Sequence, residues 1–242
     1  PRIINHVVGM GSIYANGNRS IQSWVMKRLV DFGLRRAFHS SRAQTVFQNP
    51  DDLNLWMDRA GLADNKTELI PGSISWVDQE RTPEPNVKPM KILFVGRMLQ
   101  NKGVEDLYQA WRSLRREGIK VELIFCGDID KGSPSSLTRE EMCAYGAETG
   151  CTWLGYRDDV MDIIKKCNLV VLPSYREGFP KVILEAGLSR RAVIATDVPG
   201  CRELVVHEKS GIIVQKGDIR GLALAIQGLL KDEAKRKTLA GA

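Results

Sequence analysis

The most informative stretch of the sequence runs from Leu169 to Glu185 and reads LVVLPSYREGFPKVILE. Its apolar start predicts a buried strand. Pro180 is expected as the first helical residue, because its ring fixes a helical φ and its missing N–H would have no partner there. The following helix would present the backbone N–H groups of Lys181, Val182 and Ile183. With the positive end of the helix dipole, these donors favour an anion such as a diphosphate.

Two carboxylates flank this predicted anion site. Glu177 precedes the helix and Glu185 lies in its second turn. A carboxylate at each place can accept hydrogen bonds from hydroxyl groups on either side of a diphosphate, as in a nucleotide sugar with a sugar on one side and a ribose on the other. The alternative is an ordinary Glu-Gly turn, a helix that starts at a proline, and an exposed glutamate.

A second strand, loop and helix lie upstream. Residues 90–95 read MKILFV and predict a buried parallel strand, and a loop with Arg97 and Lys102 follows it. In open α/β sheets ligands bind beyond the carboxyl ends of the strands. Arg97 can bind a phosphate through two N–H groups, and Lys102 supplies a compact second charge. The alternative is a basic loop on the surface.

Together the two elements resemble the donor site of retaining GT-B glycosyltransferases, in particular glycosyltransferase family 4 enzymes that build bacterial surface polysaccharides. The resemblance implies that Arg97 and Lys102 stabilise the departing diphosphate and that Glu177 and the N–H groups of Phe179 and Lys181 hold sugar hydroxyls. Glu185 would bind the ribose. The implied catalytic residues are therefore Arg97, Lys102 and Glu177, and the implied donor-binding residues are Gly96, Tyr156, Arg157, Gly178, Phe179, Pro180, Lys181, Val182, Ile183 and Glu185.

The implied reaction moves a sugar, with retention of configuration, from a nucleoside-diphosphate sugar to a saccharide or lipid-linked acceptor. Tyr156 and Arg157 would contact the base through backbone atoms, or else form an ordinary loop. No metal or other cofactor is expected, because fixed cations take its place, and no nucleophile for a double displacement is identified. Two alternatives remain open: a nucleotide-sugar epimerase of the same fold, and a non-catalytic nucleotide-sugar-binding fragment.

The order of elements predicts an α/β fold of GT-B type, with a Rossmann-like, doubly wound parallel sheet. Strands are expected near 91–95, 120–126, 152–154, 168–172, 192–196 and 211–214, and helices near 103–117, 137–149, 158–166, 180–189, 200–207 and 218–230. Three prolines between Trp76 and Pro89 indicate a linker. We expect a donor-binding domain over 87–242.

Residues 1–86 are expected to hold the last part of a preceding α/β domain and the linker. Helices are expected near 21–38 and 51–60. The sequence FQNPDD at 47–52 and the Pro71-Gly-Ser73 turn resemble the end of the acceptor domain in the same family. The resemblance implies further strands before Pro1, so we expect a truncated chain that by itself transfers no sugar at an appreciable rate.

Composition narrows the other possibilities. With 242 residues, of which 43% are hydrophobic, the chain can bury a core, and it has no apolar run of about 20 residues that could cross a membrane. The five cysteines form no C-x-x-C pair, which fits a reducing cytoplasm. The three histidines have no metal-ligand spacing. The net charge of +6 admits acidic partners, but no recognition motif points to nucleic acid.

The positive charge is concentrated near the start of the chain. The first 45 residues hold Arg2, Arg19, Lys27, Arg28, Arg35, Arg36 and Arg42, with Asp31 as their single acid. On the helix expected near 21–38, Lys27, Arg28 and Arg35 share one sector with Trp24 beside them. This predicts a peripheral contact with an anionic membrane, at the inner face of the plasma membrane. The alternative is the solvated edge of a core helix.

Overall fold

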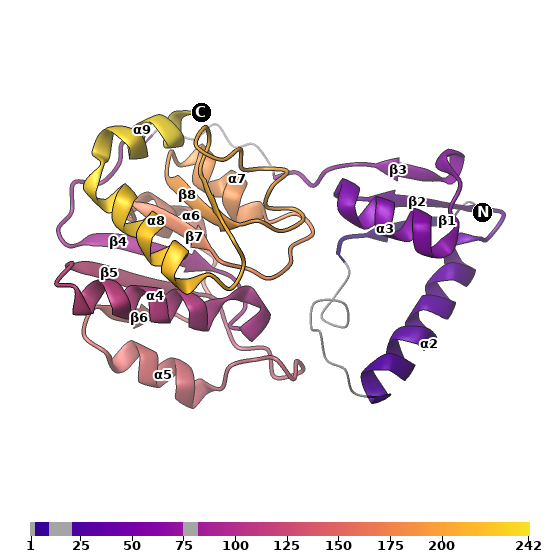
Figure 1. Cartoon of the computed structure of the whole chain (residues 1–242), viewed down its shortest axis with the longest axis horizontal. Coiled ribbons are helices and arrows are strands. Elements are labelled where there is room, and N and C mark those ends of the chain that lie inside the picture. The colour runs from indigo at the N-terminus through magenta and orange to yellow at the C-terminus, as the bar shows by residue number, and fades with distance from the viewer. Residues whose placement is uncertain (1–2, 10–20, 75–81) are drawn as a thin grey trace.

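The strands of the chain form two separate parallel sheets in the computed structural model, which describes residues 3–9, 21–74 and 82–242 (Figure 1). The smaller sheet has the order β1-β2-β3, and the larger has the order β6-β5-β4-β7-β8-β9. The strands are β1 (Ile3–Val7), β2 (Ala43–Phe47), β3 (Thr67–Leu69), β4 (Met90–Val95), β5 (Val121–Cys126), β6 (Cys151–Trp153), β7 (Leu169–Leu172), β8 (Ala192–Thr196) and β9 (Ile212–Val214). We call residues 3–74 the first region and residues 82–242 the second region.

The strand order of the larger sheet reverses between β4 and β7. These two strands are adjacent, with Ile92 opposite Leu169 and Leu93 opposite Val170, although β5 and β6 lie between them in the sequence. The loops after β4 and β7 therefore leave the same edge of the sheet side by side. In doubly wound sheets this switch point is where ligands bind.

Helices cover the larger sheet and bury it. They are α4 (Val104–Arg116), α5 (Arg139–Ala147), α6 (Val160–Lys165), α7 (Lys181–Leu188), α8 (Ile219–Lys231) and α9 (Glu233–Gly241). Every residue of β7 and of β8 is buried, as expected for strands of a parallel sheet with helices on both faces. Strand β4 is followed by the short 3₁₀ helix η2 (Gln100–Lys102), which leads into α4.

The first region has its own small core. Helices α2 (Ile21–Phe38) and α3 (Pro50–Ala60) accompany the three strands, and a short 3₁₀ helix η1 (Asp64–Lys66) precedes β3. The core groups Phe38, Phe47, Trp56, Ala60 and Leu62. Helix α3 has an asparagine cap and a proline in its first turn, both common signals of a helix start.

Most of the expected elements are confirmed, with small differences at their ends, but one expected helix is absent and one observed helix was not expected. Residues 201–204 form turns instead of the helix expected near 200–207. Gly200 has φ of 81°, and a Cβ atom added there would lie 2.6 Å from the carbonyl oxygen of Gly178. The backbone therefore makes a tight turn at Gly200 beside the loop that follows β7. Helix α9 was not predicted, because its sequence has no apolar stripe; it buries Arg236 and Leu239.

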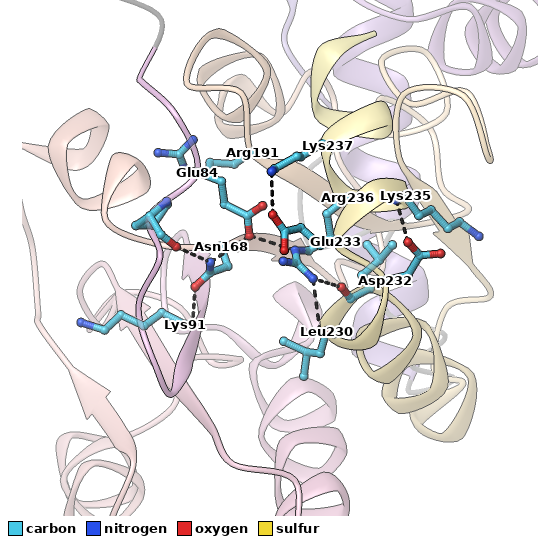
Figure 2. A network of polar contacts seen from close by, with 12 residues as sticks. Glu84, Lys91, Asn168, Arg191, Leu230, Asp232, Glu233, Lys235, Arg236 and Lys237 are labelled. Carbon is cyan, nitrogen blue, oxygen red and sulfur yellow. Dashed lines mark hydrogen bonds and ion pairs between the residues drawn. The ribbon is translucent and has the colours of Figure 1, made fainter.

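Arg236 belongs to a polar network that attaches residues 82–85 to the rest of the second region (Figure 2). Glu84 accepts hydrogen bonds from Asn168 Nδ2 at 2.9 Å and from Arg236 Nε at 2.8 Å. The buried Arg191 guanidinium donates to the carbonyl groups of Thr82 and Pro83. Residues 82–89 have no regular secondary structure, in keeping with the expected linker, whereas residues 75–81 lie outside the described part. The boundary expected at residue 86 stays a prediction.

Candidate functional site

The loop after β7 is held by the neighbouring strand and by the loop after β4. Thr196 Oγ1 on β8 donates to the carbonyl of Ser174, and the backbone N–H of Tyr175 donates to the carbonyl of Asn101 at 2.9 Å. The Tyr175 hydroxyl donates to Asp106 on α4 at 2.9 Å. These contacts fix the backbone immediately before Glu177.

Two of the expected catalytic residues, Lys102 and Glu177, form an ion pair. Lys102 Nζ lies 2.7 Å from both carboxylate oxygens of Glu177, and Ser174 Oγ donates to the same carboxylate at 2.6 Å. The side chains are 19% and 11% exposed. The structure therefore brings together residues that lie far apart in the sequence, at the switch point of the sheet.

The position of Lys102 depends on Gly103. This residue has φ of +69°, and a Cβ atom added there would lie 2.1 Å from the carbonyl oxygen of Pro173. Only glycine combines the left-handed conformation with this approach to the end of β7. Gly103 also caps the N-terminus of α4.

Arg97, the third expected catalytic residue, lies apart from that pair and is more exposed. Its Nη1 is 2.6 Å from Oδ2 of Asp130, and 64% of its side chain is accessible to solvent. Asp130 is in the loop after β5, so the cation at the end of β4 is neutralised by the neighbouring strand's loop. This partner was not predicted.

Two cavities open at this edge of the sheet. The first, of about 630 Å³, lies between the end of β1 and the loops after β4, β5 and β7, and its lining includes Arg97, Lys102, Arg176, Glu177 and Gly178. The second, of about 610 Å³, adjoins it through Arg97 and Asp130 and is lined also by Gly96, Tyr156 and Arg157. The residues expected to contact the base thus lie beside those expected to contact the diphosphate.

The N-terminus of α7 differs in detail from the expectation. Pro180 has φ of −76° and ψ of 99°, so it is the residue before the helix and not the first helical residue. Because its carbonyl then faces the first turn, it accepts a hydrogen bond from the N–H of Ile183 at 3.1 Å. Ile183 is therefore not a free donor here, and the expected anion site rests on Lys181 and Val182.

Two further donor-site expectations concern Glu185 and Phe179. Glu185 is half-buried in α7, and burial raises the pKa of its carboxyl, against the opposing effect of Lys181. It lines neither of the two cavities described, so its contact with a ribose stays a prediction. The Phe179 ring packs on Gly72 of the first region, where an added Cβ would lie 2.3 Å from the ring.

Three residues next to the site were not predicted as functional. Arg176 lines the first cavity and donates through Nη2 to Asp52 Oδ1, across the two regions. Asn49 Nδ2 donates to the carbonyl of Gly178 at 3.0 Å. The spacing Asn49-x-x-Asp52 is typical of a helix start and can be recognised in the sequence. The sequence does not indicate that Arg176 pairs with Asp52.

The expectation of a metal-free site took the sequence to contain no Asp-x-Asp pattern, and this is wrong, because Asp128-Ile129-Asp130 is one. In the structure Asp130 pairs with Arg97, and Asp128 Oδ1 accepts from the N–H of Ile129. Within residues 3–9, 21–74 and 82–242, no group of three or more His, Cys, Asp or Glu side chains could hold a metal ion. A metal-free donor site stays a prediction.

Among the described helices, none is long and apolar enough to cross a membrane. Helix α2 instead presents several large apolar side chains to solvent; they are Trp24, Val25, Met26, Leu29 and Phe32. The Arg28 guanidinium lies 5.2 Å from the centre of the Trp24 ring. Arg2 and Arg19 of the expected basic surface are outside the described residues.

Comparison with known proteins gives consistent matches. The profile of the family described as Glycosyl transferases group 1 matches residues 78–241. The N,N'-diacetylbacillosaminyl-diphospho-undecaprenol alpha-1,3-N-acetylgalactosaminyltransferase of Campylobacter jejuni is 31% identical over 97% of this chain and 62% of its own length. The capsular polysaccharide biosynthesis glycosyltransferase CapM of Staphylococcus aureus is 30% identical over 60% of this chain and 38% of its own.

A solved structure supports the same fold. Anabaena Alr3699/HepE in complex with UDP-glucose superposes with a TM-score of 0.78 at 20% identity, covering 99% of this chain and 65% of that one. The fold is that of GT-B glycosyltransferases, as the sequence predicts. The chain spans about three fifths of the length of the Campylobacter relative and about two fifths of the length of CapM.

Proposed function

The chain belongs to the group 1 glycosyl transferases, and on that premise we propose that it binds a nucleoside-diphosphate sugar for polysaccharide synthesis. The observation that carries the proposal is the Lys102–Glu177 pair, which lies in the 630 Å³ cavity near the N-terminus of α7. A cation suits the diphosphate and a carboxylate suits the hydroxyl groups of the sugar. The complex of HepE with UDP-glucose supports this ligand class.

In the proposed reaction the protein stabilises the negative charge that develops on the departing diphosphate. Lys102 and Arg97 line the cavity from the loop after β4. The N–H groups of Lys181 and Val182 would contribute from the N-terminus of α7, although neither residue lines the two cavities described. Each of the two cations is paired with a carboxylate, so the diphosphate would have to share or displace that carboxylate.

Glu177 would accept hydrogen bonds from the sugar, together with the N–H groups of Phe179 and Lys181. The base would enter the second cavity beside Gly96, Tyr156 and Arg157, and Glu185 would accept from the ribose. We propose that the transfer retains the configuration of the sugar, without a metal ion. Glu177 is committed to Lys102 and Ser174, which fits a role in binding and not that of a nucleophile.

We propose a saccharide acceptor and, following the name of the Campylobacter relative, a lipid-linked one. This chain spans 62% of that relative, so the acceptor stays a proposal. Catalysis needs both reactants held within reacting distance. Failure of a saccharide or lipid-linked acceptor to receive sugar from the nucleotide sugar that the chain binds would contradict the proposed acceptor.

The proposal is tested by a thermal-shift screen of UDP-, GDP- and ADP-sugars, followed by calorimetry in the presence of a chelator. A ligand that binds only the folded state raises its stability. We expect one class of nucleotide sugar to stabilise the chain without divalent metal. Stabilisation by none of them would contradict the proposal, and conversion of the sugar without an acceptor would favour the epimerase alternative.

We also propose that α2 contacts an anionic membrane surface, where a lipid-linked acceptor would be found. Its exposed Trp24, Leu29 and Phe32 lie on the same helix as Lys27, Arg28 and Arg35. Each basic residue near anionic lipid contributes roughly 1 kcal/mol. Co-sedimentation with liposomes should increase with anionic lipid and decrease with salt. Binding that is unchanged when Lys27, Arg28 and Arg35 are replaced by Gln would favour the alternative, the solvated edge of a core helix.

A further inference from the structure

The N-terminus of α3, in the first region, is built as a rigid polar unit. Asn49 Oδ1 accepts from the backbone N–H of Asp52 at 2.8 Å, and Asn49 Nδ2 donates to Asp52 Oδ2 at 3.0 Å. Both residues are almost completely buried. The cap needs only the first of these bonds, so a buried aspartate at this place requires another explanation.

The same two side chains reach the donor-site loop of the second region. Asp52 Oδ1 accepts from Arg176 Nη2, and Asn49 Nδ2 donates to the carbonyl of Gly178 at 3.0 Å. Arg176 and Gly178 are the residues immediately before and after Glu177. One helix start therefore holds both neighbours of the residue proposed to bind the sugar.

The burial of Asp52 makes this contact specific. A buried carboxylate is unfavourable unless a positive charge pairs with it. Asn49 Nδ2 supplies Asp52 with a neutral donor, and the Arg176 guanidinium supplies the charge. Gly178 also approaches the end of β1 closely, because a Cβ atom there would lie 1.8 Å from the carbonyl oxygen of Val8. An exposed pair between Asp51 and Arg202, at 3.5 Å, joins the same two regions without touching the loop.

We infer that Asn49 and Asp52 are positioning residues for the donor sugar, acting through Arg176 and Gly178 on Glu177. The inference rests on the proposed function, because it concerns how Glu177 meets a sugar. The diphosphate depends on Lys102 and Arg97 of the second region, whereas recognition of the sugar depends on the first region as well. Loss of the contact should therefore weaken binding of a nucleotide sugar and leave binding of the bare nucleotide almost unchanged.

The test compares UDP with UDP-glucose, or with the nucleotide sugar that the screen selects, by calorimetry on the whole chain. Asp52→Asn should lower the preference for the nucleotide sugar over its nucleoside diphosphate roughly tenfold, the scale of one charge-assisted hydrogen bond. Asn49→Ser keeps an acceptor for the cap but loses the donor to Gly178, so it should have the same effect with α3 intact. Asp51→Asn removes a neighbouring charge and should change nothing.

Hydrogen exchange of the backbone amides of residues 177–179 gives a second readout that needs no ligand. Asp52→Asn and Asn49→Ser should speed this exchange, and Asp51→Asn should not. If native protein binds no nucleotide, the proposed function is wrong, and the exchange rates still decide whether Asn49 and Asp52 fix the loop. Equal loss of affinity for nucleotide and nucleotide sugar, or unchanged exchange and affinity, would overturn the inference.

Discussion

Replacing Glu177 with Gln should have opposite effects on two ligands that share a diphosphate. Lys102 Nζ is 2.7 Å from both oxygens of Glu177. At that distance and an effective dielectric constant near 20, the attraction is about 6 kcal/mol. Desolvation of the two largely buried groups cancels much of it. A diphosphate that binds Lys102 must overcome what remains.

Glu177→Gln removes this competition. The affinity for UDP should rise by up to about tenfold, which corresponds to ~1.4 kcal/mol. A nucleotide sugar gains the same amount but loses a charge-assisted hydrogen bond of about 1.5–3 kcal/mol. The preference for the nucleotide sugar over UDP should therefore fall by about 10- to 150-fold. Lys102→Met, by contrast, should lower the affinity for both UDP and the nucleotide sugar.

Calorimetry with UDP and the nucleotide sugar, in chelator, measures both changes. Asp162→Asn is a matched control, because Asp162 pairs with Lys165 at 3.5 Å on α6, outside both cavities. A weaker affinity for UDP in Glu177→Gln would refute the reasoning, since it would show that the carboxylate assists Lys102 in binding phosphate. An unchanged preference would show that Glu177 does not meet the sugar.

Three further changes test other parts of the site. Arg97→Ala should weaken UDP binding by roughly 1.5–3 kcal/mol without metal; equal binding, or a need for divalent ion, would count against its role. Burial raises the pKa of Glu185 in the fold, so nucleotide affinity should fall as the pH falls through that pKa and the carboxylate is protonated. The free energy of unfolding should fall as the pH rises from the ordinary pKa of a glutamate to the raised one, because the folded state binds more protons than the unfolded state in that range. Glu185→Gln should bind more weakly, flatten both dependences and remain folded; equal affinity of native protein for ribo- and dideoxyribonucleotides would contradict the ribose contact. Gly103→Ala should lower the melting temperature much more than Gly118→Ala, because both residues have positive φ but an added Cβ meets the Pro173 carbonyl only at Gly103; equal shifts would show that this close approach is unimportant.

The strand and helix pattern of the second region was predictable because it depends on local properties. Buried parallel strands such as 169–172 are continuous apolar runs, and α4 follows a regular apolar stripe that ends in basic residues. Helix α9 lacked that stripe, since it buries Arg236 against Glu84 and two backbone carbonyl groups. A buried arginine looks like a surface residue in the sequence.

The candidate site was predictable as a set of groups but not as a set of pairs. The sequence places Arg97, Lys102 and Glu177 in loops after two strands, and the strand order makes those loops neighbours. It does not show that Lys102 faces Glu177, that Arg97 faces Asp130, or that Arg176 faces Asp52. The two members of each pair are separated by at least 33 residues in the sequence. Their pairing depends on how loops from different strands are arranged in space.

The pairing of Arg97, Lys102 and Arg176 with carboxylates has a consequence for competition among cellular anions. Sulfate can offer negative charge to these side chains, but it has no hydroxyl donor for the carboxylate that it would displace. A nucleotide sugar replaces both halves of the Lys102–Glu177 pair, with oxygen for the ammonium and hydroxyl for the carboxylate. Under the proposed function, internal pairing would therefore favour a nucleotide sugar over an anion, such as sulfate, that carries no hydroxyl group.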